Sequence, residues 1–379
     1  MAPMRRLFAA LLITSLGLLA PLTQAQAADL TAANKAAHWL TTQVSSGALD
    51  DGFSKIGASA DGLIGLAAAD DPTLQPTIDA LLATVKAGAA AYVSSGGGAA
   101  AGKLAIVAAA YGIDPTSFGG VDLVAALKSG VAPDGAVGPY PSAFSSGLAM
   151  AGFSRAKTTE PTTLTTWLLT QQNTDGGFGY AAGAASDADD TALAIIGLLT
   201  DSSAIAKAAL GKAVAWATAA QKSDGSWAGY VPVNSTCVMA ESLLAAGVST
   251  SLAKTYVVSQ QLADGAITDG SGANLMATSQ CLPLLGGVSY LDATWAPKAT
   301  TKPSTTPPTS TTTTARSTRT TSSSTTTTTS STGADVTATA SGRGVPALTG
   351  DDGLPLLPLV LLGAGVVAGA AGVAVRRRA

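Results

Sequence analysis

The stretch QKSDGSW, residues Gln221–Trp227, decides the fold because weaker copies of it recur along the chain. In each copy an Asp-Gly pair begins three residues after a glutamine, and a large apolar residue lies two positions beyond the glycine. The copies are Gln172–Phe178 and Gln261–Ile267, and Asp134-Gly135 marks the same place in an earlier unit. Glutamine at a helix end can bond free carbonyl oxygens, and Asp-Gly favours a tight turn. The pattern predicts repeated helix–turn–helix units.

Six apolar helical segments follow one another at spacings of 38 to 46 residues. They begin near Asp61, Gly102, Ser145, Asp190, Thr236 and Asn274. More amphipathic helices precede them, as at Asn34–Gln43, Thr162–Gln172, Ala208–Gln221 and Leu252–Gln261. Helices that are apolar on nearly every face are buried all round, and a fixed repeat period points to stacked units. We expect residues 28–295 to form an all-α fold of about twelve helices without a sheet, an α6/α6 toroid that closes as a double-walled barrel.

The Q-x-x-x-G-x-W motif at Gln221–Trp227 resembles the repeat of squalene cyclases and protein prenyltransferases. These proteins belong to the α/α-toroid superfamily, which also includes vertebrate cobalamin carriers and complement thioester domains. The resemblance spans essentially all of residues 28–295. It implies the toroid fold, whereas the activity has to be inferred from the site, because one fold hosts many functions.

The N-terminal residues 1–27 have the organisation of a secretory signal peptide. Arg5 and Arg6 precede the apolar run Leu7–Leu19, and Ala25-Gln26-Ala27 supplies the small residues of a cleavage site. We expect this segment to be removed and the mature chain to begin near Ala28.

Residues 296–345 are dominated by Thr and Ser with interspersed Pro. Such a segment has almost nothing to bury and cannot offset the entropy of an ordered chain. It is expected to form an extended stalk, and O-glycosylation of the stalk is a further expectation.

The C-terminal residues combine a short motif, an apolar span and a basic tail. Residues 354–375 are long enough to cross a bilayer as a transmembrane helix, and the arginines in residues 376–379 would stay in the cytoplasm. The motif at residues 346–350 resembles cell-wall sorting signals, which sortases cut between Thr and Gly, here Thr349 and Gly350. Pro346 replaces the usual Leu of that signal. Wall attachment and a retained membrane anchor both remain open, and either one places the protein on the outer face of the cell.

The charges and ligand-type residues of the chain exclude several functions. Residues 28–295 carry 11 basic and 21 acidic side chains, a net charge of about −10, which is unsuited to nucleic acid. One histidine and two cysteines without a C-x-x-C pair offer almost no metal ligands. We therefore expect no metal and no cofactor, with cobalamin as a possible bound ligand, and a monomeric domain.

The two cysteines, Cys237 and Cys281, lie in neighbouring predicted inner helices. Secretion favours a disulfide. However, Cys281 is expected about five residues deeper in its helix, an axial offset of roughly 7 Å, in addition to about 9 Å between helix axes. This geometry predicts two buried thiols.

The motif Asp187-Ala188-Asp189-Asp190-Thr191-Ala192 resembles the D-x-D-D-T-A of class II terpene cyclases. The resemblance implies that Asp189 would be the proton donor, with Asp187 and Asp190 crowding it and raising its pKa. The structural alternative is helix capping, since Asp at a helix start complements free N–H groups and the dipole. The predicted inner helices have few aromatic residues to stabilise carbocations, which argues against cyclisation.

A ligand site is expected where the turns lead into the inner helices. Seven aromatic residues cluster in these turns, about half of them with a packing role: Phe53, Tyr140, Phe144, Phe178, Tyr180, Trp227 and Tyr230. Polar residues are expected to open the inner helices at the same rim: Asp61, Lys103, Ser146, Asp190, Thr236 and Asn274. An apolar interior below a polar, partly aromatic rim is typical of a binding site. The candidate ligand-binding residues are Asp61, Lys103, Tyr140, Phe144, Ser146, Tyr180, Asp190, Tyr230, Thr236 and Asn274.

Three functions follow from these observations. The favoured one is binding of a cobalamin-like corrinoid, a lipid or a glycan without transforming it. The second is a terpene-cyclase-like enzyme that uses Asp187, Asp189 and Asp190. The third is a structural or adhesive surface module with an empty barrel.

Overall fold

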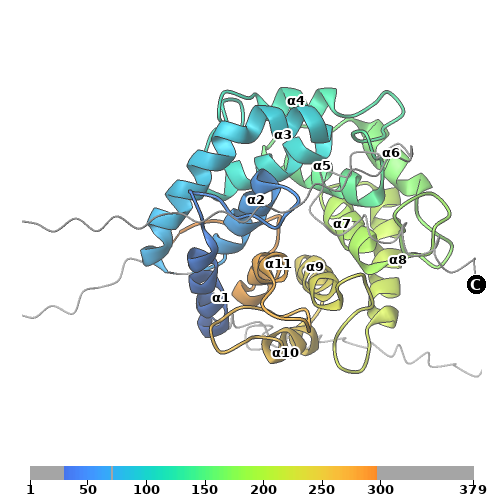
Figure 1. Cartoon of the computed structure of the whole chain (residues 1–379). Helices are drawn as coiled ribbons and strands as arrows, with labels where there is room; N and C mark the ends of the chain where they lie inside the picture. Colours follow the sequence, from blue (N-terminus) through green and yellow to red (C-terminus); the bar gives the residue numbers. More distant parts are fainter. Residues whose placement is uncertain (1–29, 70, 297–379) are drawn as a thin grey trace, which may run out of the picture. The chain divides into compact units, whose positions relative to one another are not determined.

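The computed structural model describes residues 30–69 and 71–296 of the chain. The helices are α1 (Leu30–Gln43), α2 (Lys55–Leu66), the 3-10 helix η1 (Pro72–Leu74), α3 (Gln75–Ala110), α4 (Leu123–Ser129), α5 (Ala143–Arg155), α6 (Thr162–Thr170), α7 (Ala188–Leu198), α8 (Ala204–Ala220), α9 (Pro232–Ala245), α10 (Ser251–Ser259) and α11 (Leu275–Gly286). Among the described residues only isolated β-bridges occur, without a strand. Figure 1 shows the helices arranged in a ring. The predicted signal peptide, stalk, sorting motif and transmembrane helix lie outside the described residues.

The long helix α3 consists of two helices joined at Gly97. Gly97 has φ 59° and ψ −141°, which no regular helix contains and which glycine adopts without a steric cost. In residues 75–96 the buried side chains follow helical spacing along one face, whereas nearly all of residues 98–110 are buried. The stretch Pro72–Ala110 is long and apolar enough to span a membrane, but the most apolar part of it is mostly buried inside the protein. Counting the two parts of α3 separately gives the twelve α-helices expected from the repeat.

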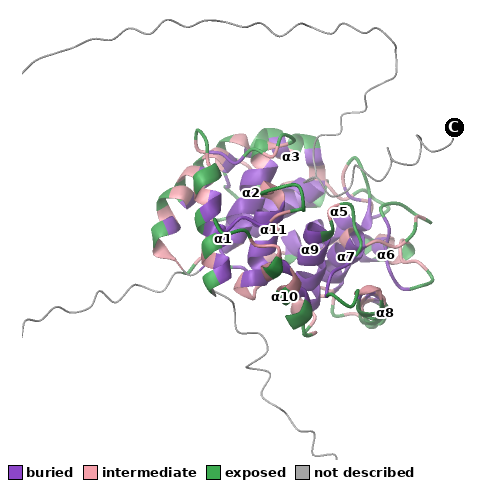
Figure 2. Cartoon of the chain, turned by 60° about the horizontal axis from the view of Figure 1, so that its bottom comes forward, coloured by how far each residue is buried: buried purple, intermediate pink, exposed green. Residues whose placement is uncertain are grey.

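The twelve helices form two concentric layers. The inner layer contains α2, residues 98–110 of α3, α5, α7, α9 and α11, whose residues are almost all buried (Figure 2). Glycines allow close approach between these helices: a Cβ on Gly147 of α5 would lie 1.9 Å from the carbonyl oxygen of Leu193 in α7. The Ala- and Gly-rich composition of the inner helices follows from this tight packing.

Two of the recurring glutamines, Gln172 and Gln261, join their hairpins to the next outer helix. Gln172 Nε2 donates hydrogen bonds to Gly176 O in its own turn, at 2.9 Å, and to Ala209 O in α8, at 2.8 Å. In the last unit, Gln261 Nε2 bonds in the same way to Gly265 O, at 3.0 Å, and to Ala32 O in α1, at 2.9 Å. The motif that builds the repeat therefore also closes the ring, and α1 packs beside α11 (Figure 1).

Residues 289–295, which we call the C-terminal strap, close one end of the barrel. Trp295 donates from its backbone N to Ala110 O and from Nε1 to Gln75 Oε1, both at 2.8 Å. Arg155, the last residue of α5, donates to the backbone oxygens of Leu291 and Ala293. The strap is thus held by the two ends of α3 and by the C-terminal end of α5.

Cys237 and Cys281 form a disulfide, with Cα atoms 4.9 Å apart, so the expectation of two buried thiols is wrong. The error came from the assumed helix starts. Helix α9 begins at Pro232, four residues before Thr236, and α11 begins at Leu275. Cys237 is therefore the sixth residue of its helix and Cys281 the seventh of its neighbour, which places them at nearly equal depth within bridging distance.

Candidate functional site

All six inner helices begin at the same end of the barrel, which we call the mouth, and the opposite end is the base. At the mouth, five loops and the Gly97 kink lead from outer to inner helices. The loops are residues 44–54, 130–142, 171–187, 221–231 and 260–274. Helix N-termini attract acceptor groups, so this end is where a polar ligand would be bound.

Four aromatic side chains are exposed, and each comes from a different mouth loop: Phe53, Tyr140, Tyr180 and Tyr230. Within the described part of the chain, the other exposed large apolar residues are aliphatic. The remaining three aromatics of the predicted cluster are buried: Phe144, Phe178 and Trp227. Four exposed and three buried rings match the expectation that about half of this cluster has a packing role.

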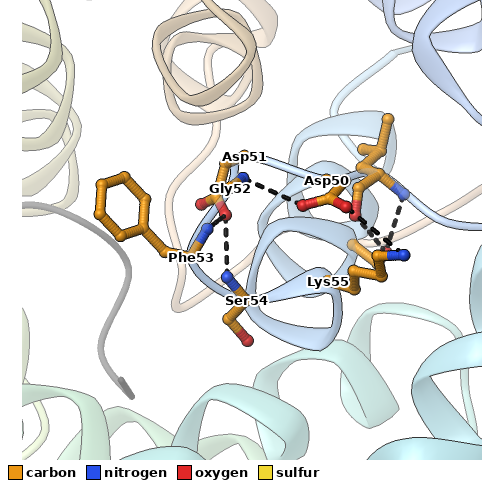
Figure 3. Close-up of polar contacts among 8 residues, drawn as sticks. Asp50, Asp51, Gly52, Phe53, Ser54 and Lys55 are labelled. Atoms are coloured by element: carbon orange, nitrogen blue, oxygen red, sulfur yellow. Dashed lines mark hydrogen bonds and ion pairs between the residues drawn. The ribbon is translucent and has the colours of Figure 1, made fainter. Parts of the chain in front are cut away.

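Phe53 lies in a hydrogen-bonded turn, and its side chain is 60% exposed. Asp51 Oδ1 accepts hydrogen bonds from the backbone N of Phe53, at 2.9 Å, and of Ser54, at 3.0 Å. Asp50 accepts from Gly52 N at 3.0 Å and forms an exposed ion pair with Lys55 at 3.5 Å. Figure 3 shows the Phe53 ring pointing away from these contacts. The loop therefore presents an aromatic ring without relying on that ring for its own packing.

The buried apolar residue that ends each motif is anchored by a threonine of the following inner helix. The backbone N of Phe178, Trp227 and Ile267 donates to the hydroxyl of Thr191, Thr236 and Thr278, at 2.9, 3.0 and 2.9 Å. The Thr236 hydroxyl also donates to Pro232 O at 2.6 Å. The hydroxyl of Thr236, a predicted ligand-binding residue, is therefore already occupied by hydrogen bonds within the fold.

The polar candidates expected at the rim lie deeper than the sequence indicated, apart from Asn274, which caps α11. The others lie within their helices and are buried: Asp61, Lys103, Ser146, Asp190 and Thr236. The structure brings Lys103, Phe144 and Tyr230 together around one central cavity. Asp61 does not line this cavity, but it forms an ion pair with Lys103, which does. Tyr140, Tyr180 and Asn274 lie in mouth loops around it.

Asp187, Asp189 and Asp190 connect three inner helices at the mouth. Asp187 caps α7 by accepting from Asp190 N at 2.9 Å, and Asp190 Oδ1 accepts from Phe144 N, at the start of α5, at 2.9 Å. Asp189 Oδ2 accepts from Ser235 Oγ of α9 at 2.9 Å. Burial raises the pKa of Asp189 to about 6. Burial and the charge of Asp187 raise the pKa of Asp190 to about 7. Of the three, Asp189 lines the cavity.

The central cavity leaves about 20 Å³ for the centre of a water-sized group, which is room for roughly one water molecule. Its polar lining residues are Lys103, Asp189, Asn234, Ser235 and Gln280. Its aromatic and aliphatic lining residues are Phe144, Leu148, Tyr230, Val231, Val238, Met276 and Tyr290. Most of the cavity surface is apolar, and the five polar side chains add hydrogen-bonding groups to it.

A buried ion pair lies beside the cavity. Lys103 Nζ is 2.7 Å from Asp61 Oδ1, and both side chains are about 5% exposed or less. Burial lowers the pKa of Lys103, but the charge of Asp61 outweighs this effect and raises it. Glu241 is also buried, and burial raises its pKa well above the usual value, although Tyr290 N donates to its Oε1 at 2.6 Å. The barrel centre is consequently a charged and hydrogen-bonded region.

Four cavity residues with hydrogen-bonding side chains were missed by the sequence analysis: Asn234, Ser235, Gln280 and Tyr290. Pro232 stands at the first position of α9, where proline is favoured, and this signal could have placed the helix start correctly. A start at Pro232 brings Asn234 and Ser235 into the first turn. No comparable sequence signal predicts the position of Tyr290, which reaches the cavity from the C-terminal strap.

A second groove, with about 450 Å³ of free space, lies at the base. Thr165 Oγ1 is 2.8 Å from Asp201 Oδ2 and 3.2 Å from Glu160 Oε1, and burial raises the pKa of Glu160 to about 7. The groove shares no lining residue with the central cavity. Among the described residues, no group of three or more His, Cys, Asp or Glu side chains could hold a metal ion.

Comparison with solved structures identifies the architecture. The type II terpene cyclase MstE from Scytonema superposes with a TM-score of 0.56 at 15% identity, covering 68% of this chain and 98% of the cyclase. A protein from Actinoplanes gives a TM-score of 0.54 at 14% identity, covering 68% and 99%. Haptocorrin in complex with Cbi gives 0.49 at 13% identity, covering 72% and 69%. No protein-family model and no curated protein matches the sequence.

The described residues therefore form an α/α-toroid, the fold that the resemblance of the QKSDGSW repeat implied. At these identities the comparisons establish the fold, and the fold by itself is compatible with ligand binding or with a cyclase-like reaction.

Proposed function

We propose that this toroid binds a glycan at its mouth without transforming it. The observation that carries the proposal is the placement of Phe53, Tyr140, Tyr180 and Tyr230, which project from four separate loops at one end of the barrel. Exposed aromatic side chains gathered on one face mark interaction sites, and Tyr combines an apolar ring with a polar tip. Such rings can pack on the apolar faces of sugars.

Polar groups beside the rings support the same ligand class. A pocket between the loop of Phe53 and the start of α11 is lined by Asp51, Asn274 and Met276, and Met276 also lines the central cavity. Carboxylate and amide groups can bond the hydroxyls of a sugar. The rim pocket and the cavity thus offer hydrogen-bonding groups along a path between Phe53 and Tyr230.

Lipid and corrinoid ligands are the alternatives within the binding proposal. Pockets for such ligands are usually about 300–1,000 Å³ and mostly apolar. The central cavity leaves only about 20 Å³, far too little for such a ligand. A glycan can bind at the mouth with its sugar rings packed on the exposed aromatic side chains, and it then requires no large internal cavity. We therefore favour a glycan.

We further propose that the domain is displayed on the cell surface. The charge pattern of residues 1–27 and the apolar span of residues 354–375 support secretion and anchoring. The described chain leaves the barrel at the base, where Trp295 bonds to Ala110 O.

The test uses the secreted protein and three β-1,4-linked hexasaccharides, of N-acetylglucosamine, of glucose and of xylose, in isothermal titration calorimetry. We expect binding of at least one of them. Phe53→Ala and Tyr230→Ala should each weaken that binding about tenfold, which corresponds to about 1.4 kcal/mol. The matched control is Ile205→Ala, which removes an equally exposed apolar side chain from α8. Absence of binding to all three, or equal losses in the control, would contradict the proposal.

A cyclase-like activity is the second candidate, because Asp189 of the D-x-D-D motif lines the central cavity. The test is incubation with prenyl chains and squalene-like substrates. If Asp189 donates a proton, Asp189→Asn should abolish cyclised products while the protein stays folded. If Asp189 only binds Ser235 and supports the helix start, no product forms in either protein, and the substitution costs less than about 1 kcal/mol. We expect the second result.

A further inference from the structure

The central cavity contains a buried acceptor without a protein partner. Asn234 is only 5% exposed, and its Nδ2 donates to Gln280 Oε1 at 3.1 Å, but its Oδ1 has no hydrogen-bond partner among the described residues. An unsatisfied buried acceptor costs about 1–3 kcal/mol. Leucine would fill a similar volume without this cost, so the amide at this position points to a ligand group that bonds it.

The cavity offers a donor as well as acceptors. Lys103 Nζ has three N–H groups and can only donate, and Asp61 Oδ1 lies 2.7 Å from it. Asn234 Oδ1 and the Asp189 carboxylate supply acceptors on the same cavity. A ligand ammonium would be repelled by Lys103, and a ligand carboxylate would be repelled by Asp189. A hydroxyl group suits both sides, because it donates one hydrogen bond and accepts two.

The size of the cavity limits what can enter. Space of about 20 Å³ admits one group the size of water and excludes a sugar ring. The entering group must therefore protrude from a ring that stays outside, at the level of Tyr230, which lines the cavity and is 65% exposed. In a glycan of hexose units, the hydroxymethyl group is the hydroxyl that projects furthest from the ring.

We propose that the central cavity is a specificity pocket for one sugar hydroxymethyl group, held between Lys103, Asn234 and Asp189. This inference rests on the proposed glycan binding and deepens it: the mouth aromatics bind the rings, and the cavity selects sugars that carry a hydroxymethyl group. Pentose units lack that group, and uronic acid units replace it with a charge that Asp189 repels.

The experiment compares the hexasaccharides of glucose and of xylose, whose β-1,4-linked rings differ only in the hydroxymethyl group. The secreted wild-type protein should bind the glucose hexamer about tenfold more tightly. Asn234→Leu should weaken binding of the glucose hexamer about tenfold and leave binding of the xylose hexamer unchanged, so that the preference disappears. Thermal unfolding should show Asn234→Leu at least as stable as the wild type, because the substitution removes an unsatisfied polar atom.

The outcomes separate the two proposals. If either hexamer binds through Phe53 and Tyr230 but the wild type shows no preference, or if Asn234→Leu keeps the preference, the cavity holds only water and the pocket is disproved. If neither these hexamers nor that of N-acetylglucosamine binds, glycan binding itself fails, and this inference fails with it. Gln280→Met, which alters the partly exposed partner of Asn234, provides a second variant should Asn234→Leu misfold, and it should reduce the preference in the same direction.

Discussion

Gln261 Nε2 donates a hydrogen bond of 2.9 Å to the backbone oxygen of Ala32, 229 positions earlier in the chain. This contact joins the last hairpin to the first helix and repeats the bond that Gln172 makes to Ala209 in the middle of the ring. Closure of the barrel thus depends on the same local contacts that generate its repeats, supplied by residues at opposite ends of the domain.

The closing turn provides a sharp stability test at Gly265. Gly265 and Gly270 have similar φ values, 100° and 96°, but a Cβ on Gly265 would lie 2.2 Å from Lys35 O, whereas one on Gly270 would have nothing within 4 Å. Both Gly→Ala substitutions share the cost of a left-handed backbone, and only Gly265→Ala separates α1 from the turn. We expect Gly265→Ala to lower the free energy of unfolding in urea by at least about 2 kcal/mol more than Gly270→Ala. Equal effects would show that the α1 contact does not stabilise the ring.

The disulfide between Cys237 and Cys281 should stabilise the contact between α9 and α11. The bridge closes a loop with a sequence separation of 44, for which loss of chain entropy in the unfolded state predicts about 3–4 kcal/mol. The double variant Cys237→Ala/Cys281→Ala should lose about this amount in urea unfolding. Mass spectrometry of the unreduced wild type should give a mass about 2 Da below that of the reduced protein. Identical masses would mean that the thiols remain free.

The buried Lys103–Asp61 pair should respond asymmetrically to mutation. Lys103→Met leaves the Asp61 charge buried without its partner and should cost about 3–5 kcal/mol. Lys103→Met/Asp61→Leu removes both charges and should recover more than half of that loss, because the desolvation cost disappears with them. Both variants are compared by urea unfolding at one pH. A double variant less stable than Lys103→Met would contradict this account.

The stability of the fold should decrease as the pH rises from about 4 to about 8. The pKa of Asp190 is raised from 3.8 to about 7 in the folded state, so folding favours the protonated form. Its stabilising contribution is complete below the unfolded pKa and is lost as the pH rises through about 7, at about 1.4 kcal/mol per unit of pKa difference. Asp189 and Glu160, with pKa values of about 6 and 7, act in the same direction.

Urea unfolding at several pH values tests this expectation. Asp190→Asn should flatten the pH dependence while keeping an oxygen acceptor for Phe144 N. Asp224→Asn serves as the control: hydrogen bonds from Ser226 lower the pKa of Asp224, so it titrates below this range and its replacement should keep the wild-type slope. An unchanged slope in Asp190→Asn would show that the pKa of Asp190 is not raised by folding.

The repeat made the fold predictable from the sequence. The residues that line the central cavity could not be predicted in the same way. Gln172, Gln221 and Gln261 recur with their Asp-Gly turns, and each unit needs its neighbour to bury its apolar face, so the toroid follows from sequence spacing. The sequence indicates the first residue of each helix less precisely than it indicates the repeat. Placing the start of α9 at Thr236 instead of Pro232 moved Cys237 along the axis and concealed Asn234.

Contacts between distant segments explain the remaining difference. Lys103 finds its partner Asp61 only because the first and second inner helices become neighbours. Tyr290 reaches the cavity from the strap, across a stretch that no repeat period governs. The exposed aromatics were easier to predict, because Phe53 and Tyr230 lie in loops whose place at the mouth is set by the hairpin pattern alone.

The C-terminal strap also determines how the domain would carry a mechanical load. A pull on the chain beyond Ala296 acts first on Trp295, and through its hydrogen bonds on Ala110 and Gln75 at the two ends of α3. The next contacts to bear the load are the hydrogen bonds that Arg155 donates to the backbone oxygens of Leu291 and Ala293. All of these contacts lie at the base. Such a pull would therefore break the hydrogen bonds of the strap before it deformed the loops around Phe53 and Tyr230.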